Sequence, residues 1–400
     1  MEKNNKTLNV PPLRFPEFSK EWEKATLQSV ATLSKGTGIS KDQLSEEGLP
    51  CILYGELYTK YNSEIIDTII SKTDIDPEKL VRSQANDVII PCSGESAVDI
   101  ATARCVKQSK VLLGGDLNII RLKGEHDGSF FAYQLNGKRK YDIAKVAQGV
   151  SVVHLYGEHL KRVMVNYPSA TEQKKISSLL ALIDQRIETQ KKIIEDLKKL
   201  KDAICNMNFT SGSALKLGNV GKFVRGLTYS ASDVIDDTMG TAVMRSNNIS
   251  NGDPANFEEL IWVNKTPNHE QILRGGDIII CMANGSSPLV GKASYYIDCG
   301  MESATVGAFC GIYRSYNPLT KWLFQSKHYK KHIQRCIQGG NGAIANIYPE
   351  DILAISFNIP SGYERVLNVL NYLEEKYLLE QKLLYRYLAV KSHLLAQLFI

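Results

Sequence analysis

The second half of this sequence repeats the first half, and this repeat constrains the fold more than any other feature. The stretch LYGEHLKRVMVNYPS (residues 155–169) returns as IYPEDILAISFNIPS (residues 347–361). Tyr156 recurs as Tyr348, a shift of 192 residues (348 − 156). Self-similarity at a fixed period is the signature of a repeated structural unit. The sequence therefore predicts one scaffold that occurs twice in the chain.

The repeat continues upstream of these stretches. LQSVATLSKGTGIS, from Leu27, resembles LGNVGKFVRGLTYS, from Leu217, and NDVIIPCSGES, from Asn86, resembles GDIIICMANGS, from Gly276. In the second pair an Asp precedes three β-branched residues, a pattern typical of a turn followed by a buried strand. Between these anchors the two halves share little. We therefore expect a common frame that carries two different sets of recognition loops.

Each copy ends in a long segment with a heptad pattern. Steps of four and three give the seam Ile176, Leu180, Ile183, Ile187, Gln190, Ile194, Leu197, Lys201 and Ile204 in the first segment. The second seam is Val366, Leu370, Leu373, Tyr377, Glu380, Leu384, Tyr387, Lys391 and Leu394, each 190 residues after its counterpart. A sustained period of 3.5 residues predicts a coiled coil.

The polar interruptions fall at the same places in the two seams. Gln190 corresponds to Glu380, and Lys201 corresponds to Lys391. Matched polar layers fix the register of paired helices, so we expect the two segments to form an antiparallel coiled coil with each other. The alternative is two separate helices, each packed on its own domain or on another protein. The apolar end HLLAQLFI is expected to dock on another subunit or on the first domain.

These patterns predict a fold of the α+β class (mixed α/β) with a pseudo-two-fold internal repeat. Two tandem globular domains are expected at residues 1–170 and 208–362, and two long helices at residues 171–207 and 363–400.

Composition and motifs exclude several classes of protein. A net charge of +5 permits nucleic-acid binding without requiring it. The eight cysteines form no CxxC pair, which argues against zinc or disulfides. No apolar run reaches bilayer length and the first residues lack a signal core, so we expect a cytoplasmic protein without membrane contact. P-loop, GxSxG, HExxH and dinucleotide patterns are missing from the sequence, so we expect no catalytic residue, metal or cofactor.

Two motifs give the chain a family resemblance. LRFPEF (residues 13–18) is followed by Trp22, and YPSATEQKKI (residues 167–176) leads into the first heptad segment. In this combination the chain resembles the specificity (S) subunit of Type I restriction–modification systems. The second copy departs from the motif, because Glu364-Arg365 replaces Glu-Gln, although the helix-capping pattern is kept.

The resemblance implies a DNA-binding function in defence against foreign DNA. Each globular domain would be a target recognition domain that reads one half of a bipartite double-stranded DNA target. The coiled coil would set the distance between the half-sites and dock two methyltransferase (M) subunits, and restriction (R) subunits would join them. The family's subunit is not an enzyme, and the methyl donor and ATP belong to its partners.

We expect DNA contacts from cations, amides and small residues in the loops, because phosphates need cations and base edges need forked donors. In the first domain these are Lys35, Gly36, Thr37, Arg104, Lys107, Lys138, Arg139, Lys140, Gln148, Gly149 and Ser151. In the second domain they are Arg225, Gly226, Arg245, Ser246, Asn247, Asn248, Asn284, Gly285, Ser286, Lys327, Lys330, Lys331, Gln338, Gly339, Gly340 and Asn341. Plain surface solvation is the alternative for each lysine. Tyr54 and Tyr58 are expected to fill the core rather than to stack on bases.

Two other functions remain open at this point. One is a non-catalytic coiled-coil scaffold that binds no nucleic acid, which a gel-shift experiment would distinguish. The other is an enzyme, either the recognition part of a fused restriction–methylation protein or a nuclease, which a methylation assay on the purified chain would distinguish.

Overall fold

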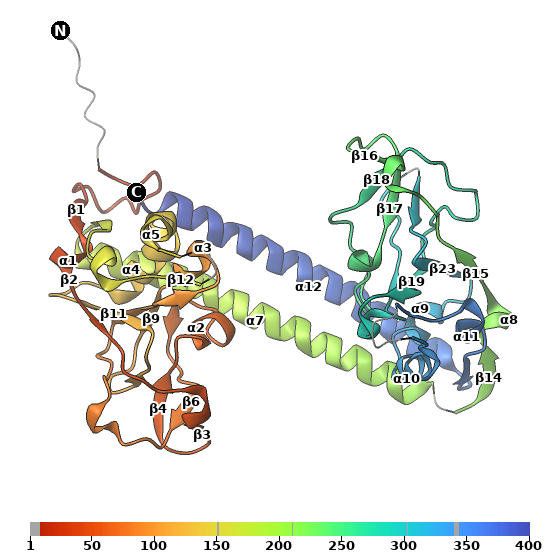
Figure 1. Cartoon of the computed structure of the whole chain (residues 1–400), viewed down its shortest axis with the longest axis horizontal. Coiled ribbons are helices and arrows are strands. Elements are labelled where there is room, and N and C mark those ends of the chain that lie inside the picture. Colours follow the sequence, from red (N-terminus) through yellow and green to blue (C-terminus); the bar gives the residue numbers. More distant parts are fainter. Residues whose placement is uncertain (1–8, 150–151, 210, 302, 340–343) are drawn as a thin grey trace, which may run out of the picture. The chain divides into compact units, whose positions relative to one another are not determined.

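The computed structural model describes residues 9–149, 152–209, 211–301, 303–339 and 344–400. The chain divides into two compact units (Figure 1). The first unit contains Met1–Lys192 and Lys382–Ile400, and the second contains Ile193–Gln381. Each unit therefore contains a globular head and a part of both long helices. The predicted division into four consecutive segments stays a prediction.

The head of the first unit is built on mixed β-sheets. One sheet has the order β2 (Ala31–Lys35), β11 (Leu117–Leu122), β7 (Asp87–Pro91), β9 (Arg104–Val106) and β5 (Ile65–Ile66). A second has the order β10 (Leu112–Leu113), β4 (Leu49–Ile52), β6 (Ser71–Thr73) and β3 (Leu44–Ser45). Two further pairs are β1 (Glu23–Thr26) with β13 (Met164–Tyr167), and β8 (Ser93–Gly94) with β12 (Val153–His154). All five residues of β7 are buried, as the apolar run after Asn86 predicts.

Helices complete the first unit. The short ones are α1 (Leu27–Val30), α2 (Glu56–Thr59), α3 (Ala97–Ile100), α5 (Lys140–Val146) and α6 (Gly157–Leu160), and the longer α4 spans Gly128–Asn136. Helix α4 packs on β7 and β9 and is buried along most of its length. The C-terminal Leu398 and Phe399 lie in the same core as Trp22 and Phe130. The apolar C-terminus therefore docks on the first unit, one of its two expected places.

The second unit repeats this plan. Its first sheet has the order β15 (Gly221–Arg225), β23 (Cys310–Ser315), β19 (Ile278–Cys281) and β21 (Ala293–Tyr295). The second has the order β16 (Val234–Ile235), β18 (Ile261–Val263), β17 (Thr241–Met244) and β22 (Ala304–Val306). The two-stranded pairs are β14 (Ser213–Lys216) with β25 (Ser356–Ile359), and β20 (Ala283–Asn284) with β24 (Ala345–Asn346). Its shorter helices are α8 (Leu217–Val220), α9 (Thr320–Leu323), α10 (Lys327–Cys336) and α11 (Pro349–Leu353).

An ion pair with a buried aspartate recurs at matching places in the two heads. In the first unit the Arg121 guanidinium, on β11, lies 2.7 Å from the carboxylate of Asp87, on β7. In the second unit Arg314, on β23, lies 2.6 Å from Asp277, which directly precedes β19. The predicted mixed α/β architecture with two tandem domains is confirmed.

The long helices are α7 (Ala170–Asn208) and α12 (Tyr363–Gln397). Every seam position named from the sequence is buried or half-buried. Neither polar lysine of the seam faces the other. Lys201 Nζ lies 2.9 Å from Glu374 Oε2 in the second unit, and Lys391 Nζ lies 2.6 Å from Asp184 Oδ1 in the first.

These two ion pairs are equivalent under the repeat. Lys201 and Lys391 differ by 190 positions, as do Asp184 and Glu374 (374 − 184). Within the described ranges, no helix has the apolar length to cross a lipid bilayer.

Candidate nucleic-acid interface

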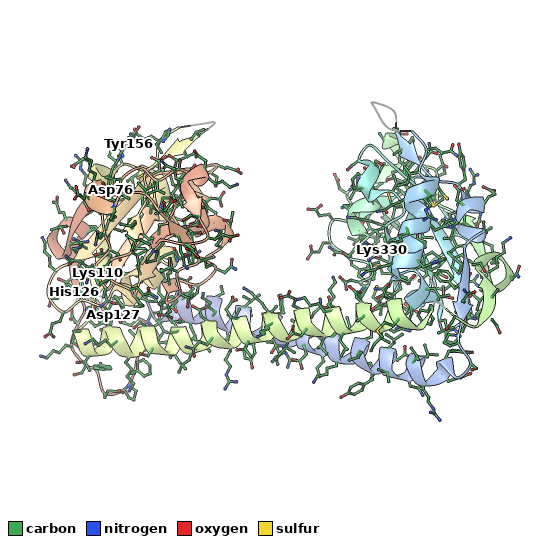
Figure 2. All side chains as sticks on the ribbon, turned by 90° about the horizontal axis from the view of Figure 1, so that it is seen from below. Asp76, Lys110, His126, Asp127, Tyr156 and Lys330 are labelled. Carbon is green, nitrogen blue, oxygen red and sulfur yellow. The ribbon has the colours of Figure 1, made fainter. Side chains whose placement is uncertain are left out.

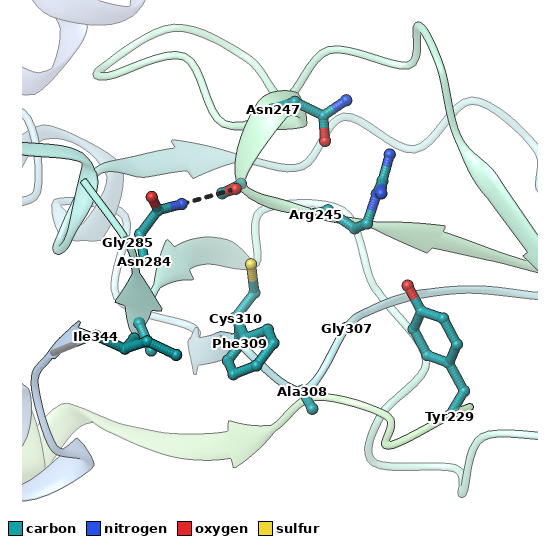
Figure 3. A pocket seen from close by; sticks show the side chains of 12 residues that line it. Tyr229, Arg245, Asn247, Asn284, Gly285, Gly307, Ala308, Phe309, Cys310 and Ile344 are labelled. Atoms are coloured by element: carbon teal, nitrogen blue, oxygen red, sulfur yellow. Dashed lines mark hydrogen bonds between the residues drawn. The ribbon is translucent and has the colours of Figure 1, made fainter. Parts of the chain in front are cut away.

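The second unit has an open cavity of about 690 Å³ beside the turn that follows β17 (Figure 3). Arg245, Ser246 and Asn247 line it from this turn. The turn is held by Asn248, which is buried, accepts a hydrogen bond from Arg245 N at 2.8 Å and donates one to Glu258 O at 2.7 Å. Asn248 therefore positions the turn, while Arg245 and Asn247 extend from it toward the same side (Figure 3).

The opposite wall of this cavity comes from the β20–β24 ribbon. Asn284 Nδ2, on β20, donates to Ser246 Oγ at 3.1 Å and ties the ribbon to the turn (Figure 3). Gly285 follows in the chain, and the apolar side chains of Phe309 and Ile344 are largely exposed at the edge. The structure thus brings together five of the residues expected to contact DNA: Arg245, Ser246, Asn247, Asn284 and Gly285.

The first unit has a cavity of about 640 Å³ at the matching place in its frame. Its turn follows β4 and is held by Glu56, whose Oε2 accepts from Leu53 N at 2.9 Å as Asn248 accepts from Arg245 N. Its ribbon is β8–β12, the counterpart of β20–β24. The lining is Tyr54, Gly55, Tyr58, Thr59, Ser93, Gly94, Glu95, Asp99, Thr102 and Val152. The frame is shared and the lining is different.

The structure corrects the expectation that Tyr54 and Tyr58 fill the core. Their side chains are 38% and 36% exposed and form one wall of the first-unit cavity. The hydroxyl of Tyr58 donates to Ser93 O at 3.0 Å, so the ring lies across the cavity rather than beneath the sheet. Burial of this part of the ring raises the pKa of Tyr58, with a smaller effect from Asp99, and the phenol stays neutral.

Glu95, Asp99 and Thr102 line this cavity but were not among the residues expected to contact DNA, because they are neither cations nor amides. The internal repeat of the sequence does point to Glu95. Glu95 aligns with Gly285 at the common shift of 190, and Gly285 was already a candidate. Carboxylates at the matching place indicate that the same surface of the frame can carry either charge.

A helix with exposed cations lies next to each ribbon in the chain. In the second unit α10 buries Tyr329 and Ile333, which leaves Lys327, Lys330, Lys331 and Arg335 at the surface or half-buried (Figure 2 labels Lys330). In the first unit α5 and the residues before it carry Lys138, Lys140 and Lys145. These positive charges can contact phosphates while the cavity faces base edges.

Arg139 directly precedes α5 and differs from its neighbours. Its guanidinium lies 3.0 Å from Asp142 Oδ2 and 3.0 Å from Ile400 O, and thus holds the chain end on the first unit. Its position favours a structural role over phosphate contact.

Two hairpins connect these helices to the cavities. In the first, Gln148 N donates to His154 O at 2.9 Å, and in the second Gln338 N donates to Asn346 O at 2.9 Å. Gly149 and Gly339 adopt positive φ angles of 120° and 81°, a backbone conformation that favours glycine. The candidates Ser151, Gly340 and Asn341 lie outside the described residues. Ser286 follows β20, and its N–H donates to Asn284 Oδ1 at 2.9 Å.

Several other candidates serve the packing of the heads. A Cβ on Gly36 would lie 2.0 Å from Gly114 O, and one on Gly226 would lie 2.1 Å from Gly307 O, so both glycines permit close backbone approach. Thr37 Oγ1 accepts from Val81 N at 2.9 Å. Gly36, Gly226 and Thr37 therefore take part in the packing of the heads and do not line a cavity. Lys35 and Arg225 end β2 and β15, and Lys35 Nζ lies 5.9 Å from the centre of the Tyr156 ring.

Arg104 and Lys107 lie on and just after β9, away from the cavity lining. Burial lowers the pKa of Arg104, and its guanidinium donates to Tyr61 O and Ala103 O, each at 3.1 Å. Lys107 Nζ donates to Asn86 Oδ1 at 2.9 Å and lies 3.7 Å from Asp127, which sits beside the start of α7 (Figure 2). Both cations therefore bind to groups of the first unit itself.

The described residues include possible metal ligands and thiols. No group of three or more His, Cys, Asp or Glu side chains among them is placed to hold a metal ion. Cys310 lines the second-unit cavity, but burial raises its pKa, so it is not a thiolate near neutral pH.

Comparisons with known proteins agree with this geometry. A family model described as Type I restriction modification DNA specificity domain matches residues 19–199. The StySPI specificity subunit of a type I restriction enzyme from Salmonella potsdam is 31% identical over 162 residues, which cover 37% of this chain and 33% of the relative. The EcoKI specificity subunit from Escherichia coli (strain K12) is 30% identical over 156 residues, which cover 36% and 32%. The chain thus matches about a third of the length of these relatives.

Solved structures extend the similarity to the whole fold. The S subunit of a type I restriction–modification system from M. genitalium has a TM-score of 0.62 and 17% identity, covering 98% of this chain and 99% of that one. A chain from a study of complex assembly and conformational transition of the type I R-M system has a TM-score of 0.53 and 12% identity, covering 97% and 99%. Identities this low show a common fold alone. Residues 19–199 of this chain thus resemble the type I restriction modification DNA specificity domain, and the chain shares the fold of these S subunits.

Proposed function

We propose that this chain gives a type I restriction–modification complex its DNA sequence specificity and has no catalytic site of its own. Each head reads one half of a bipartite double-stranded target, and the paired helices set the half-site spacing. The observation that carries this proposal is the pair of cavities. They occupy the same place in two copies of one frame, each beside a cationic helix, and their linings differ. A cytoplasmic location follows from a role on cellular DNA.

The second-unit cavity has the chemistry of direct base readout. An arginine such as Arg245 can donate two hydrogen bonds to guanine O6 and N7, and an amide such as Asn247 can pair with adenine N6 and N7. The exposed rings and methyls of Phe309 and Ile344 suit contact with a thymine methyl group. Lys330 and Lys331 on α10 supply the phosphate contacts that fix the register of the head on the duplex.

The long helices carry exposed apolar side chains that support two equivalent partner sites. In the first unit these include Leu182 and Val390, and in the second Tyr372 and Leu200. Leu182 and Tyr372 are 190 positions apart, as are Leu200 and Val390, so the repeat duplicates the surface. Exposed apolar side chains are common in protein interaction sites. Two methyltransferase subunits docked there, joined by restriction subunits, would supply the methyl donor chemistry and the ATP-dependent steps.

Replacing Arg245 or Asn247 by alanine should relax the base preference in one half of the target and leave the other half unchanged. Each loss should cost about 1–3 kcal/mol of discrimination at the contacted base pair. The measurement is sequencing of duplexes selected from a randomised library by the complex captured through a tag on this chain. Asn264→Ala, at an exposed position of the same unit, is the matched control. Equal loss in both halves, or capture of no bipartite sequence by the unaltered chain, would contradict the proposal.

Replacing Lys330 and Lys331 together by alanine should weaken DNA binding without changing the selected sequence. Each lost phosphate contact lowers the slope of log K against log salt by about 0.9, so the slope should fall by about 2. Titrations of a target duplex between low and high salt provide the measurement. Lys222→Ala with Lys265→Ala, two exposed lysines of the same unit that lie on or after other strands, should leave the slope as it is. An unchanged slope in the α10 variant would show that Lys330 and Lys331 do not contact phosphates.

A further inference from the structure

The two cavities differ in the sign of their charge. Arg245 is the charged residue among the described lining of the second-unit cavity. The described lining of the first-unit cavity contains Glu95 and Asp99 and neither lysine nor arginine. The frame around the two cavities is the same. We therefore attribute the difference in charge to the ligand that each cavity contacts, and not to the scaffold of the head.

Most hydroxyl donors of the first-unit cavity, other than that of Tyr54, are already used within the protein. Tyr58 donates to Ser93 O at 3.0 Å and Thr102 to Asp99 O at 2.7 Å. Thr59 donates to Gly55 O at 3.0 Å. A ligand in this cavity therefore meets few free donors.

The acceptors of the same cavity remain available. Ser96 Oγ donates to Asp99 Oδ2 at 2.6 Å, which orients this carboxylate and leaves Oδ1 without a hydrogen bond from the described residues. Glu95 is exposed and has neither a hydrogen bond nor an ion pair within the described part of the chain. The cavity thus presents carboxylate oxygens to whatever enters it.

We propose that the first-unit cavity reads, through Glu95 and Asp99, a base with an exocyclic amino group in the major groove, cytosine N4 or adenine N6. Carboxylates only accept hydrogen bonds, so they pair with these amino groups. They repel guanine O6 and N7 and thymine O4, which are acceptors too. This inference rests on the proposed function, and it assigns a substrate preference to one of its two sites.

The position of the carboxylates also separates base contact from phosphate contact. A surface with two negative charges and no cation repels the phosphate backbone, so base edges are the part of a duplex that it can approach favourably. Helix α3, which carries Asp99, packs directly against α5. The cations Lys138, Lys140 and Lys145 can therefore hold the phosphates while the cavity lies over the base edges.

The test uses the complex captured through a tag on the full chain and a randomised duplex library. Glu95→Gln and Asp99→Asn keep the size of each side chain and give it a donor. In one half of the selected target, the preference for cytosine or adenine at one or two positions should fall about tenfold or more for each variant. The other half should not change. The matched control is Asp76→Asn with Glu78→Gln, two exposed acids of the same unit outside the cavity.

The outcomes separate this inference from the proposed function. If the unaltered chain selects a bipartite target and both cavity variants select it unchanged, the inference is wrong and the proposed function stands. A guanine or thymine at the position that responds, or a response in the half read by the second unit, also overturns the inference. If the unaltered chain selects no sequence, the proposed function itself fails.

Discussion

Replacing Lys201 by methionine should lower the free energy of unfolding of the second unit by about 3–5 kcal/mol. The ammonium is buried with 2% exposure for the residue and bonds Glu374, which is 3% exposed. It also lies 4.8 Å from the centre of the Tyr377 ring. Without the ammonium, Glu374 keeps the hydrogen bond from Tyr295 but stays buried without its ion-pair partner. Removing one partner of such a pair lowers the free energy of unfolding by more than the intact pair contributes to it, because the remaining charge is buried away from water.

Hydrogen exchange resolved by peptide measures this loss in the second unit separately from the first. Lys199→Met is the matched control, because Lys199 lies on the same helix in an exposed pair with Glu195. Its effect should stay within about 0.5 kcal/mol. Adding Glu374→Gln to Lys201→Met should restore part of the stability, since the amide can still accept from Tyr295 and carries no charge. If Lys201→Met and Lys199→Met behave alike, the buried pair does not hold the unit together.

Replacing Lys391 by methionine should destabilise the first unit by a similar amount. Lys391 Nζ lies 2.6 Å from both Glu64 Oε2 and Asp184 Oδ1, and these residues are 7% and 6% exposed. Burial acts to lower the pKa of Lys391, but the two carboxylates outweigh it and the pKa is raised. The ammonium therefore stays charged, and the stability that it contributes is retained below its ordinary pKa and lost only in strong alkali.

The loss follows from the two carboxylates that remain, because they stay buried without the ammonium that bonds both of them. Thermal unfolding of the first unit measures this loss. Lys382→Met, an exposed position on the same helix, should leave the stability as it is. If Lys391→Met and Lys382→Met unfold alike, the ammonium does not stabilise the first unit.

The two lysines have a common structural role. Each joins α7 to α12, and each cluster reaches the head of its own unit through a tyrosine. Tyr133, on α4, donates to Asp184 at 2.7 Å, and Tyr295, on β21, donates to Glu374. The polar interruptions of the seam thus set the register of the helices and fasten each head to them.

The helices and the duplicated frame could be predicted from the sequence. The two long helices expected from the heptad pattern are observed as Ala170–Asn208 and Tyr363–Gln397. The runs that begin at Asp87 and Asp277 lead into buried strands, as their β-branched residues indicate. Periodicity and β-branching act over neighbouring residues, so a single sequence records them directly.

The acidic partners of the seam lysines could not be predicted in this way. The sequence places Lys201 and Lys391 at matching seam positions, but it does not show which residues they contact. Their partners Glu374 and Asp184 are 173 and 207 residues away in the chain (374 − 201 and 391 − 184). Only the pairing of the two helices brings these charges together.

By itself, the sequence determined that this protein is one mixed α/β frame written twice and joined to two heptad helices, because these features depend on local spacing. The cavities were decided by the tertiary structure alone. Each is assembled from a turn, a short ribbon and a hairpin that lie far apart in the sequence, such as Arg245, Asn284 and Ile344 in the second unit. Which side chains converge there depends on how the strands pair and pack, and that is why the carboxylates of the first cavity became visible only in the folded chain.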